Sequence, residues 1–175
     1  CGRFRYDVGQ YFKSLENPPL LDVNKVLETG EIAPETRASF AFYAQNPLDV
    51  VPDEWEVPCP TWPNHPERNQ LLANAIEAMD AAEVDALIFP TWSNPPAHIE
   101  LANEEYRGDN NQRLTPDAGL PAVTIPMAFW QNKLPAGLQF VGRPYAEGLL
   151  IELAYAYEQK TKHRRPPEGF GEVNE

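Results

Sequence analysis

Apolar and polar positions between residues 119 and 163 follow a pattern that predicts two strands and a helix. Residues 120–129 form an apolar, β-branched run that contains prolines. Residues 132–133 are polar, and residues 134–141 then alternate loosely between apolar and small or polar side chains, as a second strand does. From Ala146 onward, apolar residues recur at helical spacing. This stretch therefore predicts strand, turn, strand and helix.

A second helix and a third strand precede this stretch. Residues 66–83 repeat apolar side chains on one face of a helix, and residues 84–90 follow as a short apolar strand. The predicted buried stripe of the helix consists of Leu71, Leu72, Ala75, Ile76, Met79 and Ala82. A long loop of polar and small residues, residues 91–115, comes after the strand.

These elements predict an α/β fold with a mixed β-sheet flanked by helices. We expect residues 87–89, 123–125 and 138–140 to be neighbouring strands of that sheet. Because they form nearly continuous apolar runs, we expect helices to cover both faces of the sheet.

The first part of the chain predicts three short helices, over residues 6–15, 23–28 and 35–45. Asp22 is a suitable N-cap for the second helix, and Gly30 fits the position just beyond its end. Residues 49–66 then form an acidic loop that prolines interrupt.

By length, residues 1–175 are expected to form a single domain. Within it we distinguish a helical and proline-rich lead-in (residues 1–65), an α/β part (residues 66–165) and a loose tail (residues 166–175).

Composition excludes several classes of partner. The chain has 26 acidic and 14 basic residues, for a net charge of -12, so we expect no nucleic-acid partner. No apolar run reaches the roughly 18 residues of a membrane span, and the start of the chain lacks the apolar segment of a signal peptide. We therefore favour a cytoplasmic location. Because the chain does not begin with Met, we expect it to be a piece of a longer polypeptide.

The two cysteines allow two interpretations. Cys1 and Cys59 can form one disulfide or remain two free thiols, and we favour the free thiols.

The loop of residues 91–115 is the candidate ligand site, because ligands of open α/β sheets bind beyond the carboxyl ends of strands. Its His98-Ile99-Glu100 run matches part of a zinc-deaminase motif, but no later P-C-x-x-C supplies the other ligands, so we expect no metal and no cofactor. Ser93 is not presented by a G-x-S-x-G turn, and we interpret it as an ordinary loop serine. Lys133, in the predicted turn, is expected to be solvated.

Residues 108–111, Gly-Asp-Asn-Asn, leave two interpretations open. They form either an ordinary polar turn or a segment whose carboxylate and amides point into the site.

Several motifs together are more specific than any of them alone. They are DALIFPT at residues 85–91, Gly108-Asp109-Asn110, GLPAVTIPM at residues 119–127, LPAGLQFVG at residues 134–142 and LAYAYEQ at residues 153–159. In this combination the chain resembles the carboxyl-terminal part of the amidase signature family, most closely over residues 66–165. The resemblance implies strands of a large mixed sheet, outer helices and one wall of a substrate pocket.

The resemblance also implies which residues the chain lacks. Members of this family cleave amides with a serine nucleophile, a second serine on a cis peptide and a lysine base, all within a Gly/Ser-rich signature. These 175 residues contain no such run, so the resemblance implies that the catalytic residues lie outside this chain.

A possible pocket residue follows from the same resemblance. In the amidotransferase members of the family, an acidic residue ten positions before the glycine that opens the G-x-P strand contacts the substrate. Asp109 lies ten positions before Gly119, so the resemblance places Asp109, with Asn110 and Asn111, at the substrate pocket.

Two functions from different classes follow. In the first, the chain is the carboxyl-terminal part of an amidase that acts on a small amide, and its partner is the amino-terminal part, in the same polypeptide or on a second chain. In the second, it is a non-catalytic binding module that keeps the pocket wall. In the first case the strands would pack against the missing part of the fold, so we expect an exposed apolar face and association, with that part or with a second copy of this chain. We favour the enzyme.

Overall fold

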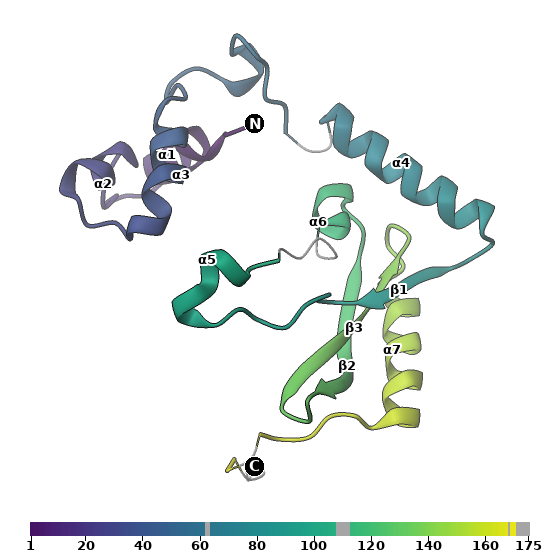
Figure 1. Cartoon of the computed structure of the whole chain (residues 1–175). Coiled ribbons are helices and arrows are strands. Elements are labelled where there is room, and N and C mark those ends of the chain that lie inside the picture. Colours follow the sequence, from purple (N-terminus) through teal and green to yellow (C-terminus); the bar gives the residue numbers. More distant parts are fainter. Residues whose placement is uncertain (62–63, 108–112, 168, 171–175) are drawn as a thin grey trace. The chain divides into compact units, whose positions relative to one another are not determined.

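The structure is a computed structural model that describes residues 1–61, 64–107, 113–167 and 169–170 (Figure 1). Its contacts divide the chain into two compact units, Cys1–His65 (unit 1) and Pro66–Glu175 (unit 2). The division coincides with the end of the proline-rich lead-in. Our expectation that residues 1–175 form a single domain stays a prediction, because each unit is described by itself.

Unit 1 contains the three short helices that the sequence predicted. They are α1 (Phe4–Lys13), α2 (Asn24–Thr29) and α3 (Pro34–Ala44), and a 3-10 turn, η1 (Pro52–Glu54), follows them. Gly30 lies at the end of α2 with φ 74°, a left-handed conformation that glycine adopts without steric cost. The three predictions are confirmed to within two residues at each end.

Arg5 connects these helices through its guanidinium group. It bonds to both carboxylate oxygens of Asp22, at 3.0 and 2.6 Å, and donates to the carbonyl oxygens of Ala44 and Asn46, at 2.9 and 2.7 Å. The Asp22 carboxylate also accepts the backbone N–H of Asn24, the first residue of α2, at 3.0 Å, although the N-cap residue is Val23 and not Asp22 as predicted. The hydrogen bonds from Arg5 lower the pKa of the Asp22 carboxyl. Arg5, on α1, therefore connects that helix to Asp22, just before the start of α2, and to the end of α3.

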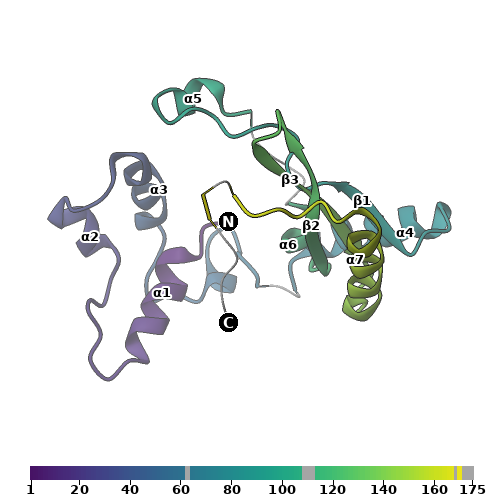
Figure 2. The same cartoon turned by 90° about the horizontal axis from the view of Figure 1, so that it is seen from below.

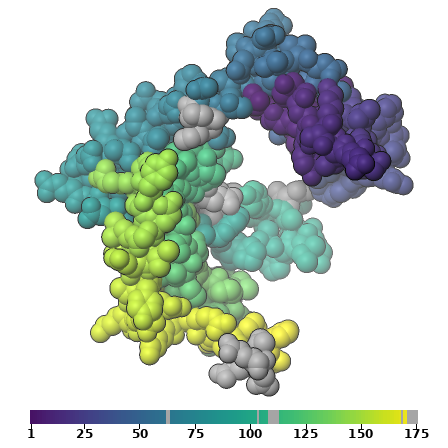
Figure 3. All heavy atoms as spheres, turned by 180° about the vertical axis from the view of Figure 1, so that it is seen from behind, coloured from purple at the N-terminus to yellow at the C-terminus, as the bar shows by residue number. Residues whose placement is uncertain are grey.

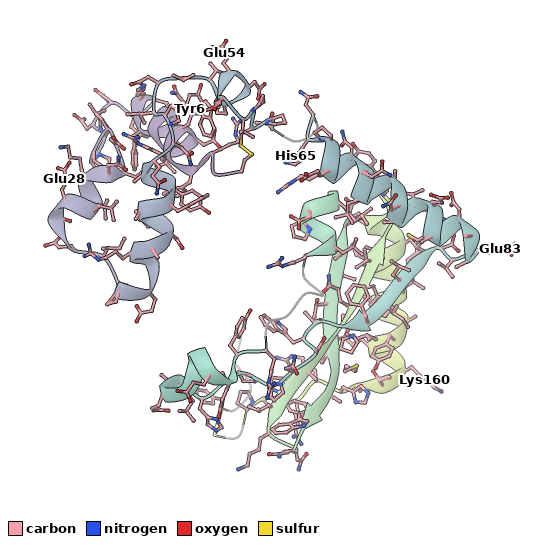
Figure 4. The ribbon with its side chains drawn as sticks, turned by 45° about the horizontal axis from the view of Figure 1, so that its top comes forward. Tyr6, Glu28, Glu54, His65, Glu83 and Lys160 are labelled. Carbon is pink, nitrogen blue, oxygen red and sulfur yellow. A yellow bond between two sulfur atoms is a disulfide. The ribbon has the colours of Figure 1, made fainter. Side chains whose placement is uncertain are left out.

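A disulfide joins Cys1 to Cys59, seen as the yellow bond in Figure 4. Our preference for free thiols was wrong. The loop that follows α3 folds back through a bond from the Cys59 N–H to the Pro52 carbonyl at 2.9 Å. Arg3 also donates to the Cys59 carbonyl at 2.6 Å, and the two cysteine Cα atoms lie 5.7 Å apart. This return of the chain could not be deduced from the spacing of the two cysteines.

Unit 2 contains a three-stranded sheet of β1 (Ala86–Pro90), β2 (Ala122–Trp130) and β3 (Leu134–Gly142). The strand order is β1-β3-β2, and both pairs are antiparallel. Leu87 and Ala122 both pair with Val141, so β3 holds the other two strands in register. The predicted α/β fold is thus confirmed, with an antiparallel sheet among the described residues.

Helices pack on both faces of this sheet (Figures 1 and 2). Helices α4 (Pro66–Ala81) and α6 (Leu114–Ala118) pack with Val141, whereas α7 (Glu147–Thr161) packs with Phe140. Adjacent residues of a strand point to opposite faces, which explains the two separate apolar clusters. Met79 of α4 is completely buried, as predicted. Ala82 is exposed, contrary to the prediction, because it lies beyond the end of α4.

The expected burial of all three strands is correct only for β3. Residues 138–142 of β3 are buried throughout, but the flanking strands alternate between half-buried and exposed positions. Ile88 of β1 is 62% exposed although it pairs with buried Phe140, because α7 packs mainly on β2 and β3. Apolar runs in β1 and β2 therefore indicate surface that the described residues of unit 2 leave partly exposed.

The turn between β2 and β3 is tied to the segment that follows α7. Gln131 and Asn132 both have positive φ, at 48° and 61°, as the tight turn of a hairpin requires. Arg165 donates to the backbone and side-chain oxygens of Asn132 and lies 3.9 Å from the ring centre of Phe129.

In the part of the chain that the structure describes, no helix is long and apolar enough to span a membrane.

Candidate functional site

A pocket of about 530 Å³ lies in unit 2, between the loop that follows β1 and the turn end of the β2–β3 hairpin. It is lined by residues 92–97, Tyr106, Arg107, Trp130 and residues 134–137. The loop thus supplies one side of the pocket and the hairpin supplies the other. The pocket lies at the loop that the sequence identified as the candidate ligand site.

Thr91 fixes the loop to the sheet where the pocket begins. Its backbone N–H donates to the Gly137 carbonyl at 2.8 Å, and its hydroxyl bonds to the Thr124 hydroxyl at 3.2 Å. A Cβ at Gly137 would lie 2.7 Å from the Thr124 methyl and 2.8 Å from the Thr91 hydroxyl oxygen. Glycine at this position therefore allows the first loop residue to approach β3 closely.

Apolar and aromatic side chains dominate the lining. Trp92 and Trp130 are each 50% exposed, and Tyr106 is 62% exposed, although they line a pocket. Two consecutive prolines, Pro95 and Pro96, add further flat apolar surface. The loop was predicted from the sequence, but the hairpin side of the pocket was not. The signal available there was Trp130, the aromatic residue directly after the predicted strand of residues 120–129.

A second hollow, of about 640 Å³, adjoins the first and shares residues 94–97, Arg107, Trp130 and Leu134 with it. His98 and Glu105 line this hollow and bond to each other. The Glu105 carboxylate accepts the His98 backbone N–H at 3.0 Å and contacts its ring nitrogen Nδ1 at 2.7 Å, and these bonds lower the pKa of Glu105. The short helical segment that follows His98 consists of η2 (Ile99–Leu101) and α5 (Ala102–Glu105), so these bonds join its two ends.

His98, Ser93 and Lys133 were the candidates for metal binding or nucleophilic chemistry, and the structure describes all three. His98 pairs with Glu105, and among the described residues no three His, Cys, Asp or Glu side chains are grouped as a metal site would require. Ser93 lines the first pocket. Lys133 is exposed in the hairpin turn, as predicted.

Asp109, Asn110 and Asn111 lie outside the described residues, so their role at the pocket stays a prediction. The chain leads into this segment from Arg107, which lines both hollows, and is described again from Arg113.

Comparisons with known proteins agree on one family for this chain. The sequence model of the family Amidase matches residues 61–151. The A subunit of glutamyl-tRNA(Gln) amidotransferase from Moorella thermoacetica is 58% identical over 52 residues, which are 29% of this chain and 10% of that protein. The protein of the same name from Desulforudis audaxviator is 49% identical over 93 residues, which are 50% of this chain and 19% of that protein.

A solved structure agrees with the sequence comparisons. The native peptide amidase from Stenotrophomonas maltophilia has a TM-score of 0.67 and 26% identity, over 95% of this chain and 33% of that one. The chain thus spans about a third of the peptide amidase and a tenth to a fifth of the two amidotransferase proteins.

Proposed function

This chain belongs to the amidase family, and we propose that it acts as part of a hydrolase that cleaves a carboxamide bond. In this proposal, unit 2 contributes strands of the sheet and one wall of the substrate pocket. The serine nucleophile, the second serine and the lysine base lie outside these 175 residues. Hydrolysis through an acyl-serine intermediate needs both a nucleophile and a base, so this chain alone is expected to be inactive.

The observation that carries the proposal is the pocket of about 530 Å³ within the part of the chain that matches the family. Its size is within the range of roughly 300–1,000 Å³ that is typical of small-molecule sites. Its lining residues come from the loop after β1 and from the hairpin, and residues 134–137 among them belong to a motif on which the resemblance rests. A small amide is therefore the ligand class that we assign to it.

Exposed apolar side chains support a partner for unit 2. Ile88 of β1 is 62% exposed, and Ile151 and Tyr155 of α7 are each 63% exposed. Figure 3 shows α7, in yellow-green, at the surface of unit 2. We propose that the rest of an amidase, in the same polypeptide or on a second chain, covers such surfaces. Self-association is the alternative when that partner is absent.

Asp109 has the leading role among the proposed pocket residues, with Asn110 and Asn111 beside it. It follows Arg107, a residue of the pocket wall, by two positions. In this proposal, the Asp109 carboxylate and the two neighbouring amides orient a polar group of the substrate.

A second candidate function is a non-catalytic binding module. The observation in its favour is that the described lining of the pocket comes entirely from unit 2. Such a module would bind small ligands without any turnover.

Isolation of the protein from its natural source, with an antibody against unit 2, would test the proposal. Intact mass shows whether the 175 residues continue into, or copurify with, a Gly/Ser-rich signature, and release of ammonia from a simple carboxamide measures turnover. We expect turnover by that material and none by the recombinant 175-residue chain. Turnover by the recombinant chain that Ser93→Ala abolishes would contradict the proposal, and a natural protein without turnover would favour the binding module.

Paired substitutions in the active natural protein would test Asp109. Asp109→Asn should raise KM about tenfold, since hydrogen bonds to charged groups contribute roughly 1.5–3 kcal/mol. Glu100→Gln, in the same loop, is the matched control and should leave KM unchanged.

A further inference from the structure

The pocket wall combines three large aromatic side chains from two different segments. Trp92 and Tyr106 come from the loop between β1 and α6, and Trp130 comes from the end of β2. Each has half or more of its surface exposed to solvent. Aromatic side chains dominate binding energetics because they present a large rigid area at little cost in conformational entropy. Their convergence on one hollow indicates a ligand that offers a flat apolar surface.

The charge of the pocket wall indicates whether this ligand is neutral or cationic. Arg107 is the only charged side chain among the described residues that line the first pocket. A cation held against the aromatic rings would be repelled by its guanidinium group, whereas a carbonyl oxygen would accept a hydrogen bond from it. Glu104 and Glu105 line only the adjoining hollow, so in the first pocket itself Arg107 favours a neutral ligand over a cationic one, although aromatic rings alone also attract cations.

The construction of the wall is also suited to a rigid ligand. Thr91 fixes the start of the loop to Gly137, and Pro95 and Pro96 restrict the backbone of the loop that follows. A preformed apolar wall loses less conformational entropy on binding than a flexible one.

We propose that this pocket binds the ring of an aryl or arylalkyl carboxamide, with Arg107 donating to the carbonyl oxygen. The identification of the ligand as an amide rests on the proposed function. The recognition of a neutral aromatic ring rests only on the wall itself.

Direct binding to the 175-residue chain tests this inference without any catalysis. The probes are benzamide, cyclohexanecarboxamide and benzyltrimethylammonium, and binding is measured by saturation-transfer NMR. Aromatic pairs contribute about 0.5–1.5 kcal/mol beyond the area they bury, so benzamide should bind roughly three- to tenfold more tightly than its cyclohexane analogue. The ammonium probe should bind more weakly than benzamide.

Substitutions in the pocket wall test whether benzamide binds there. Trp130→Leu should weaken benzamide about tenfold, and Trp130→Phe should restore most of the loss, since loss of one aromatic stacking partner costs roughly 1–3 kcal/mol in nucleobase stacking. Tyr155 of α7 is 63% exposed and lines neither hollow, so Tyr155→Leu is the control and should leave benzamide binding unchanged. Circular dichroism checks folding, and Tyr106→Leu replaces Trp130→Leu if that variant unfolds.

Equal binding of the two uncharged probes, or preference for the ammonium probe, would overturn the inference, as would benzamide binding that neither Trp130→Leu nor Tyr106→Leu weakens. Because these measurements need no turnover, binding by a natural protein without amidase activity would reject the proposed hydrolase and retain the aromatic pocket. Turnover of aliphatic amides alone, with no binding of benzamide, would support the proposed hydrolase and reject the aromatic pocket.

Discussion

Unit 1 and unit 2 are stabilised by different kinds of interaction. Unit 1 contains three helices of 10, 6 and 11 residues, a disulfide, and the ion pair between Arg5 and Asp22. In the described part of unit 1, the buried apolar side chains are those of Val23, Pro52 and Cys59. Unit 2 instead has a sheet with an apolar cluster on each face.

The difference shows how a small segment compensates for a small apolar core. Helices this short are marginal in water on their own, so tertiary contacts must stabilise them. Unit 1 uses a covalent bond and charged hydrogen bonds, which respond to reducing agents and to pH. Unit 2 uses buried apolar area, which responds to neither. Each of the following predictions acts on one unit and should leave the other unchanged.

Reduction of the disulfide should have the largest effect. Cys1 and Cys59 are 58 positions apart, and loop-closure entropy for that length corresponds to about 4 kcal/mol of stabilisation. Hydrogen exchange followed by peptide mass spectrometry should show loss of protection in residues 1–61 after addition of a reducing agent, and no change in β3. A Cys1→Ser variant should show the same loss without reducing agent and no further change with it. Unchanged protection of α1 and α3 after reduction would contradict the prediction.

Removal of the Leu150 side chain should have the next largest effect, confined to unit 2. Leu150 is 2% exposed and packs against Gly142 and the Phe140 cluster, so Leu150→Ala should lower the free energy of unfolding by about 3 kcal/mol. Ile151, the next residue of α7, is 63% exposed, and Ile151→Ala should cost less than about 0.5 kcal/mol.

Urea unfolding of both variants checks these values, with exchange in α7 as the local measurement. Similar losses for the two variants of the isolated chain would mean that Ile151 is already covered, for example by self-association.

Acidification should have the smallest effect, and it should be confined to unit 1. Arg5 depresses the pKa of Asp22, so the stability from this pair is fully present above the ordinary carboxyl pKa of about 4 and is lost as the pH falls below it. Protection of α2 should therefore decrease over that range of pH. Asp22→Asn should remove this contribution and cost about 1–2 kcal/mol at neutral pH, because the pair is partly exposed.

Asp49→Asn is the control for this experiment. Asp49 pairs with Lys13 at 2.7 Å but is 74% exposed, so its loss should change little. A pH dependence that persists in Asp22→Asn would assign it to another carboxyl group.

The sequence predicted the position of nearly every long element but not how much of each element is covered. The ends of α4, β2, β3 and α7 agree with the apolar pattern to within two residues, because that pattern follows the period of the backbone. The exposure of Ile88 was not predictable, since it depends on which strands α7 covers. The short helices α5, within the predicted loop, and α6, which begins at its end, contain too few residues for a periodic signal.

The sequence alone determined the fold class, the hairpin, the loop that carries the candidate site and the likeness to a family, because local periodicity and short motifs are properties of neighbouring residues. Tertiary structure decided the rest. The Cys1–Cys59 bond required a loop to return over 58 positions, and the aromatic pocket required Trp92 and Trp130 to line the same hollow. Contacts between distant residues depend on strand register and chain reversal, and the free energies that fix these are summed over the whole fold rather than over any single segment.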